Sequence, residues 1–319
     1  SNYSYSSSTY RTYTHYDFNF PSQELKPKLS GNYILKVYRN YDAKDVIITR
    51  RFMVINQTFI VTGLANSATN PEFRFKKQEI DFEVNYASYN IPNPMMDVTA
   101  VVLQNQRWDN AIFDLKPRFI NQKVLSYNYE QGNLFNGGNE FRYFDIRSLR
   151  FLSFNVRRKY IDENNTKNVV LYNDGMKGHQ PYLQTIDYNG KRVIDNRDGN
   201  NGELEGDYCL VHFTLISDKL DKDVYIFGEL TDWQMQDSFK MEYNEGLQQY
   251  EKVVLLKQAM YNYYYVTQSD NPLENVDISE TEGNFFNTEN DYNVLIYHKN
   301  QFMKYDELLG SLHLNSARK

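Results

Sequence analysis

The side chains best suited to acid–base, nucleophilic or metal chemistry are few and isolated in this sequence. Cys209 is the only cysteine, so neither an internal disulfide nor a CxxC redox pair can form. Its neighbours predict a strand that buries the thiol. The histidines lack the HxH or HExxH spacing that places two imidazoles on one metal ion; they are His15, His179, His212, His298 and His313. The sequence therefore indicates no catalytic residue, no metal site and no cofactor.

Carboxylates are plentiful, but their spacing is that of turns. Asp195, Asp198 and Glu203 lie in a run of Asn and Gly that could be mistaken for a calcium loop. An EF-hand needs oxygen ligands at fixed alternate positions between two helices, whereas Asp/Asn/Gly runs favour turns, so a solvated linker is the favoured interpretation. Adjacent acids such as Asp162 and Glu163 do not face each other across a cleft, as glycoside hydrolysis requires. The protein is accordingly predicted not to be an enzyme.

An aromatic corner is the sharpest candidate for a binding site. Residues 224–227 alternate as a strand does, and the chain then turns through Thr-Asp to Trp233. An exposed indole can stack on a sugar ring, whereas a half-buried one closes the end of a sandwich or contacts a protein. Tyr261, Tyr263 and Tyr265 lie in a later strand-like run, where alternation should expose about half of the tyrosines. Together with Trp233, these three tyrosines are the candidate ligand or partner contacts.

Composition and charge narrow the class of protein further. The 319 residues include 28 Tyr and 20 Phe, and the many short alternating runs favour an all-β fold of sandwich domains. The formal net charge is −6, and the largest basic cluster is the triplet at 157–159. Nucleic-acid binding requires a positively charged surface, so no nucleic acid is expected as a partner. No apolar run approaches the roughly 18 residues of a membrane helix, so no membrane-spanning segment is predicted.

The pattern predicts tandem immunoglobulin-like β-sandwiches. Residues 1–57 are expected to form a partial sandwich, shortened at its N-terminus, because a complete one takes about 100 residues. Residues 58–203 are expected to form a larger sandwich and residues 204–298 a third, followed by a tail at 299–319. The tail segment 305–310 suits either a short helix or a strand. Strands of the third domain are predicted at 208–215, 224–227, 250–256, 261–266 and 292–297.

Two resemblances rest on these residues. The strand, the glycine and the Asp-Trp corner at 224–233 are similar to the early-set immunoglobulin-like domains that include glycogen-binding modules. Nearly the whole chain resembles the plug protein family of the type IX secretion system of Bacteroidetes-type bacteria. The run Asn-Glu-Phe-Arg-x-Phe-Asp at 139–145 is its most specific segment. The segments that carry the plug resemblance are 30–38, 139–149, 207–208, 224–233, 283–292 and 294–297.

The plug resemblance implies a non-enzymatic periplasmic protein associated with the outer membrane. Such a protein would block the periplasmic mouth of the outer-membrane translocon barrel, its expected partner, until cargo arrives. The family supplies no catalytic residue to transfer to this chain. The glycogen-binding resemblance implies the alternative, a carbohydrate-binding protein that holds a glycan with Trp233 and nearby tyrosines.

Overall fold

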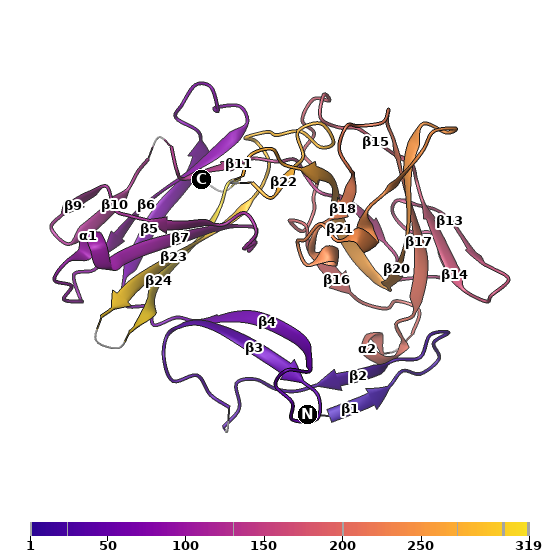
Figure 1. Ribbon diagram of the computed structural model, residues 1–319, viewed down its shortest axis with the longest axis horizontal. Helices are drawn as coiled ribbons and strands as arrows, with labels where there is room; N and C mark the ends of the chain where they lie inside the picture. The colour runs from indigo at the N-terminus through magenta and orange to yellow at the C-terminus, as the bar shows by residue number, and fades with distance from the viewer. Residues whose placement is uncertain are drawn as a thin grey trace. The chain divides into compact units, whose positions relative to one another are not determined.

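The computed structural model describes residues 2–23, 25–129, 131–199, 201–272, 274–301 and 304–317. Strands hold 45% of the residues and helices 5%, which confirms the predicted all-β fold class. The helical elements are single turns: α1 (Pro94–Asp97), α2 (Gly202–Glu205), η1 (Glu229–Thr231) and η2 (Asp237–Phe239). Two compact units divide the chain (Figure 1). Unit 1 comprises residues 1–19 and 136–289, and unit 2 comprises residues 20–135 and 290–319.

Unit 1 is a sandwich of two sheets with a separate hairpin, β1 (Asn2–Tyr5) and β2 (Thr14–Asp17). Its first sheet contains β12 (Arg142–Asp145), β16 (Arg192–Ile194), β18 (Tyr225–Phe227), β21 (Ala259–Gln268) and β22 (Val276–Asp277). Its second sheet contains β13 (Val156–Ile161), β14 (Lys167–Leu171), β15 (Asp174–Gly175), β17 (Tyr208–Ile216), β19 (Glu242–Asn244) and β20 (Gln249–Lys257). Every second residue of β17, from Cys209 to Leu215, enters the core between the sheets, as strand geometry requires.

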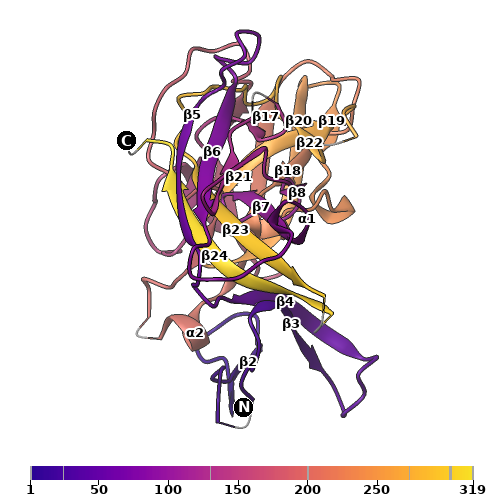
Figure 2. The ribbon, with the colours of Figure 1, turned by 90° about the vertical axis from the view of Figure 1, so that its left-hand side faces the viewer.

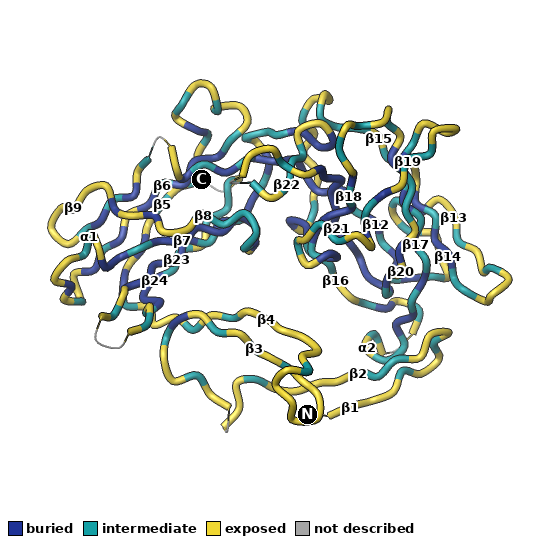
Figure 3. The backbone as a smooth tube through the Cα atoms, viewed as in Figure 1, coloured by how far each residue is buried: buried dark blue, intermediate teal, exposed yellow. Residues whose placement is uncertain are grey.

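Strand β21 is buried along both of its faces (Figure 3). Tyr261, Tyr263 and Tyr265 enter the core shared with the second sheet. On the opposite face, Tyr264 stacks on Phe141 with ring centroids 3.7 Å apart, inside a second apolar cluster. The expectation that about half of these tyrosines are exposed is therefore wrong, because a further apolar layer covers the face that would otherwise meet solvent.

Unit 2 is also built from two sheets around an apolar core (Figure 2). One sheet contains β5 (Ile60–Ser67), β6 (Lys77–Asn85), β9 (Phe119–Asn121), β10 (Val124–Tyr127) and β11 (Leu134–Asn136). The other contains β7 (Val98–Gln104), β8 (Ile112–Leu115), β23 (Asp291–Asn300) and β24 (Tyr305–Asn315). A two-stranded hairpin, β3 (Gly31–Tyr38) and β4 (Val46–Val54), completes the unit. Its strands are largely exposed, unlike those of the sandwich (Figure 3).

The strand predicted at 292–297 is present within β23, but its partners lie far along the chain. Tyr292 is opposite Gln104, and His298 is opposite Val98, in an antiparallel ladder between β23 and β7. The 305–310 segment, which suited a helix or a strand, belongs to β24 and pairs with β23. Each compact unit thus combines two separate segments of the chain. The division into consecutive domains at residues 57, 203 and 298 stays a prediction.

Candidate functional site

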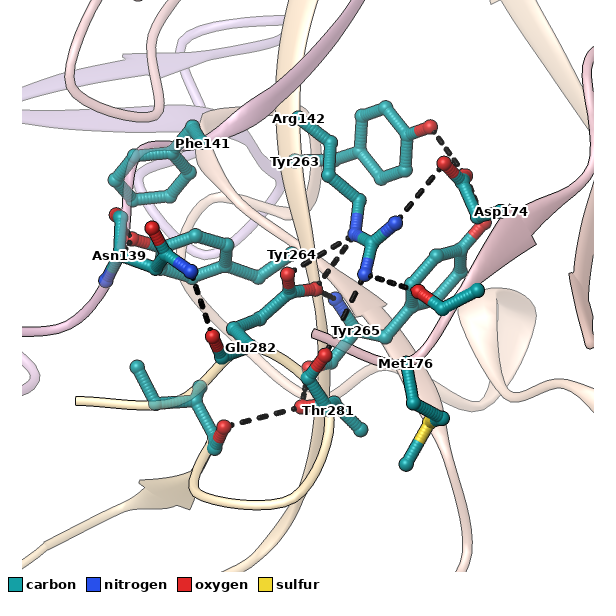
Figure 4. A network of polar contacts seen from close by, with 12 residues as sticks. Asn139, Phe141, Arg142, Asp174, Met176, Tyr263, Tyr264, Tyr265, Thr281 and Glu282 are labelled. Atoms are coloured by element: carbon teal, nitrogen blue, oxygen red, sulfur yellow. Dashed lines mark hydrogen bonds and ion pairs between the residues drawn. The ribbon is translucent and has the colours of Figure 1, made fainter. Parts of the chain in front are cut away.

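A buried arginine, Arg142, lies at the centre of the segment 139–145, the most specific part of the resemblance (Figure 4). Arg142 is 6% exposed and Glu282 is fully buried. Nε of Arg142 donates to the two carboxylate oxygens of Glu282 at 2.9 and 3.0 Å. Its Nη1 donates to Oδ1 of Asp174 at 3.0 Å, and its Nη2 donates to the carbonyl oxygen of Gly175 at 2.8 Å. One guanidinium therefore ties β12 to β15 and to the segment that contains Glu282.

The two carboxylates also accept hydrogen bonds from β21. The hydroxyls of Tyr263 and Tyr265 donate to Oδ2 of Asp174 at 2.7 and 2.9 Å. The backbone amide of Tyr265 donates to Oε1 of Glu282 at 2.9 Å. The guanidinium carbon of Arg142 lies 5.1 Å from the centroid of the Tyr265 ring, a cation–π contact. Buried charges are costly unless they are paired and hydrogen-bonded, and this network satisfies both conditions.

The electrostatics favour a charged Arg142 and neutral hydroxyls on Tyr263 and Tyr265. Burial would lower the pKa of Arg142, but the charges of Glu282 and Asp174 raise this pKa above its usual value. Burial and the charge of Asp174 raise the pKa values of Tyr263 and Tyr265 well above normal. General acid–base catalysis needs a group that exchanges protons near the working pH. The pKa values of Arg142, Tyr263 and Tyr265 are all shifted away from that range, and the hydrogen bonds of Arg142 tie three segments of unit 1 together.

The residues just before Arg142 fasten a long irregular segment, residues 176–191. The hydroxyl of Tyr182 donates to Oε1 of Glu140, and the backbone amide of Phe141 donates to Oδ2 of Asp187. Burial raises the pKa of Asp187 to about 7, although backbone N–H donors lower it, and the charge of Glu140 adds to the increase. Glu140 and Phe141 thus fix the segment 176–191 at two points along its length.

The residues after β12 form a turn that is held by side-chain hydrogen bonds. Oγ of Ser148 donates to Oδ1 of Asp198 at 2.6 Å, and the amide of Leu149 donates to Oδ2 at 2.5 Å. Nζ of Lys159 donates to the carbonyl oxygen of Ser148 at 2.7 Å. Asp198, weighed above as a calcium ligand, therefore holds a turn. Among the described residues, no group of three or more His, Cys, Asp or Glu side chains is arranged to bind a metal ion.

Trp233 closes a corner of unit 1. Its indole is half-buried and meets the ring of Phe227 edge-on, with centroids 5.7 Å apart, and that of Phe141 at 6.1 Å. It also covers Gly190, where an added Cβ would come within 2.2 Å of the indole. These contacts favour the corner-packing interpretation. Sugar stacking by Trp233 stays a prediction.

The three tyrosines proposed with Trp233 lie inside the protein. Tyr261 is 2% exposed, and Tyr263 and Tyr265 are fully buried. Their rings cannot touch a ligand while the core is intact, because the second sheet covers them. The structure brings Tyr263 and Tyr265 to Asp174, and it places Tyr261 next to Phe144, with ring centroids 5.3 Å apart. We do not include these tyrosines in a contact surface.

The second tryptophan, Trp108, lines a pocket of about 360 Å³ in unit 2. The guanidinium carbon of Arg51, on β4, lies 5.2 Å from the centroid of its ring. The other lining residues are Asn32, Tyr33, Ile34, Phe52, Met53 and Phe113. The pocket is mainly aromatic and aliphatic, and it lies where the β3–β4 hairpin faces the connection between β7 and β8.

Comparison with known proteins relates this chain to a protein family and to a solved structure. Residues 1–56 match the family model described as type 9 secretion system plug protein 1st domain. A solved structure described as a hypothetical protein from Parabacteroides merdae is 31% identical, with a TM-score of 0.92, over 98% of this chain and 79% of that chain. The chain contains the first domain of the type 9 secretion system plug protein family. This confirms the predicted resemblance and supports a role related to type IX secretion.

The comparison with curated proteins found no match. Within the part of the chain that the structure describes, no helix has the length and apolar character needed to cross a membrane.

Sequence reasoning selected the segment that contains Arg142 but missed its partners. Glu282 and Asp174 lie 140 and 32 residues away along the chain. The available indicator was a charged residue at the same strand face as Phe144, a core position. Arginine is almost never buried without a partner, so this pattern implies a buried carboxylate without saying which one.

Proposed function

We propose that this protein is the plug that blocks the periplasmic mouth of the outer-membrane translocon of type IX secretion. The observation that carries the proposal is the match of residues 1–56 to the first domain of the plug protein. In this role the protein is periplasmic and non-enzymatic, and the translocon barrel is its partner.

Two properties of the structure support this role. A plug has to keep its shape while it contacts a large partner, and the Arg142 network ties together segments of unit 1 that are distant in the chain. The segment that matches the plug domain also exposes aromatic side chains, which are enriched at protein interfaces. Tyr3, Tyr5 and Tyr16 on the β1–β2 hairpin are 62%, 70% and 71% exposed.

Affinity purification from the native host tests the proposal. The tagged full chain is recovered from the detergent-solubilised envelope, and the proteins that accompany it are identified by mass spectrometry. We expect a very large outer-membrane barrel protein, which an untagged strain processed in parallel does not yield. In a strain that lacks the gene, we expect the outer membrane to admit large antibiotics and the plasmid-borne gene to restore exclusion.

Repeated recovery of the protein without a barrel, together with unchanged permeability in the deletion strain, would contradict the plug role. A glycan array probed with the same preparation then tests the carbohydrate-binding alternative.

A further inference from the structure

Unit 2 contains a groove between the β3–β4 hairpin and the sheet of β7, β8, β23 and β24. Two adjoining cavities of about 360 and 520 Å³ form this groove, and Asn32, Tyr33, Trp108 and Phe113 line both of them. Each volume falls within the roughly 300–1,000 Å³ that is typical of ligand pockets. We call the two cavities together the hairpin groove.

The walls of the hairpin groove are fixed to one another. The hydroxyl of Tyr297 on β23 donates to Oδ1 of Asn32 on β3 at 2.9 Å. The amide of Asn56, which follows β4, donates to the carbonyl oxygen of Leu308 on β24 at 3.0 Å. These two hydrogen bonds hold the open end of the hairpin against the sheet. Because the walls are already ordered, a ligand does not have to order them on binding, which favours affinity.

A β-bulge on β8 brings two consecutive side chains to the groove. The register of the β7–β8 ladder shifts between Ala100 and Val102, which oppose a stretch of β8 that is one residue longer. Within that stretch Asp114 has a φ of +55°, in the left-handed region. Consecutive residues of a regular strand point to opposite faces, yet Phe113 and Asp114 both line the larger cavity. The bulge therefore places an aromatic ring and a carboxylate next to each other at the ligand surface.

The smaller cavity suits a large apolar side chain. Ile34, Met53 and Phe113 line it and are 67%, 36% and 52% exposed, so apolar surface is left for a ligand to cover. Arg51, the charged residue that lines this cavity, has its guanidinium carbon 5.2 Å from the centroid of the Trp108 ring. Trp108 also packs against an apolar cluster of the sheet. These contacts make Trp108 a wall of the cavity, whereas stacking on a sugar needs an open aromatic face.

The larger cavity is acidic. Its charged lining residues are Asp114 and Asp306, and both are exposed. Lys299 is opposite Asp306 in the β23–β24 ladder, but within the described part of the chain no ion pair joins either carboxylate to a cation. Two carboxylates beside an apolar wall attract a cationic group of a ligand, because the wall limits screening by water.

We propose that the hairpin groove binds an extended protein segment that carries a large apolar side chain next to a lysine or arginine. The apolar side chain fills the smaller cavity, and the basic side chain pairs with Asp114 and Asp306 in the larger one. The cavities share lining residues, so both side chains come from neighbouring positions of one segment. Lining residues that stay half exposed form a shallow groove, which suits an extended segment better than a small molecule that needs enclosure. This site goes beyond the plug role and does not depend on it.

Selection from a library of random octapeptides, displayed against the immobilised full chain, tests the proposal. We expect enriched peptides to share a large apolar residue within two positions of Lys or Arg. The affinity of the most enriched peptide is then measured by fluorescence polarisation. Asp114→Asn with Asp306→Asn should weaken binding by about tenfold, because two exposed ion pairs are lost while asparagine tolerates the left-handed backbone. Asp218→Asn with Asp221→Asn is the matched control, since it removes the same charge from an exposed loop of unit 1 and should leave the affinity unchanged.

A ¹⁹F NMR experiment locates the bound peptide. The chain contains two tryptophans, so labelling with 5-fluorotryptophan gives two signals, which Trp108→Phe and Trp233→Phe assign. The selected peptide should shift the signal of Trp108 and leave that of Trp233 in place. Phe113→Ser should reduce the affinity for the peptide by tenfold or more, and an unchanged Tm shows that the exposed site is still folded.

Several results would each overturn the proposal: no enriched motif, a motif without a basic residue, equal loss of affinity in the two Asp→Asn double variants, or a shift at Trp233 instead of Trp108. A shift of the Trp108 signal by a glycan from an array, with no peptide selected, would also overturn it. None of these results changes the recovery of a translocon barrel with the tagged protein, so failure of the groove and failure of the plug role are distinguishable.

Discussion

The Arg142 network allows a sharp test of how unit 1 is held together. Arg142→Met keeps much of the apolar stem of the side chain but removes the guanidinium. Glu282 is fully buried and would lose both hydrogen bonds that it accepts from Nε, while Asp174 would lose the one from Nη1. Removing one partner of a buried ion pair typically costs 3–5 kcal/mol, because an uncompensated charge remains. We expect the free energy of unfolding of unit 1 to fall by about 4 kcal/mol.

A second substitution separates the energetic cost of the unpaired Glu282 charge from the cost of the lost hydrogen bonds. Glu282→Gln removes the negative charge and keeps a side-chain oxygen that can accept from the amide of Tyr265. In the Arg142→Met background, it should therefore restore stability by roughly 2 kcal/mol, a coupling typical of residues in one buried network. In the wild-type background the same substitution should destabilise, because the guanidinium then lacks one of its two carboxylates.

Each unit contains one tryptophan, which makes the assay specific. In a Trp108→Phe background, the intrinsic fluorescence reports from Trp233 in unit 1, and urea unfolding gives the free energy by linear extrapolation. Arg197→Met is the matched control, since its side chain is 57% exposed and lies 4.0 Å from Asp145. Exposed ion pairs contribute about 1 kcal/mol or less. If Arg142→Met costs no more than this control, or if the effects of the two network substitutions simply add, the reasoning is refuted.

Three further predictions concern the corner and the loop beside this network. Trp233→Ala should lower the free energy of unfolding by about 2 kcal/mol or more, measured by calorimetry, because the indole fills the space between Phe141 and Phe227; unchanged stability with lost glycan binding would instead favour the sugar platform. Gly190→Ala should destabilise by more than about 1 kcal/mol in the urea assay, because φ is +80° and the new Cβ would meet Trp233, so a neutral effect would contradict the packing. The pKa of Asp187 is about 7 in the folded protein against an ordinary value of 3.8, so the folded state binds more protons between these values. The contribution of Asp187 to stability is therefore lost as pH rises from about 4 to about 7, by at most about 1.4 kcal/mol per pH unit. Asp187→Asn should remove this part of the pH dependence of Tm. An identical pH profile in the variant would count against this role of Asp187.

Strand positions were accessible from the amino-acid pattern because side-chain alternation is a local property of the extended backbone. The runs at 208–215 and 261–266 are strands, β17 and β21, and Cys209 is buried on β17 as its neighbours indicated. The resemblance to the plug family was also recognisable, because each segment that carries it is continuous in the chain; the family model confirms it for residues 1–56. These features depend on residues within one short stretch.

Which strands pair and which side chains are buried depended on the tertiary structure. The same alternation that marks β23 as a strand cannot say that it pairs with β7, because the energy of a ladder is similar for many partners and loop-closure entropy grows only slowly with the length of chain between them. Tyr261, Tyr263 and Tyr265 suit a surface as well as a core by type, and the opposite sheet decided their burial. A buried arginine at position 142 implies a buried carboxylate partner. Tertiary packing decided which carboxylates these are, because Glu282 and Asp174 reach Arg142 only when distant segments pack around β21.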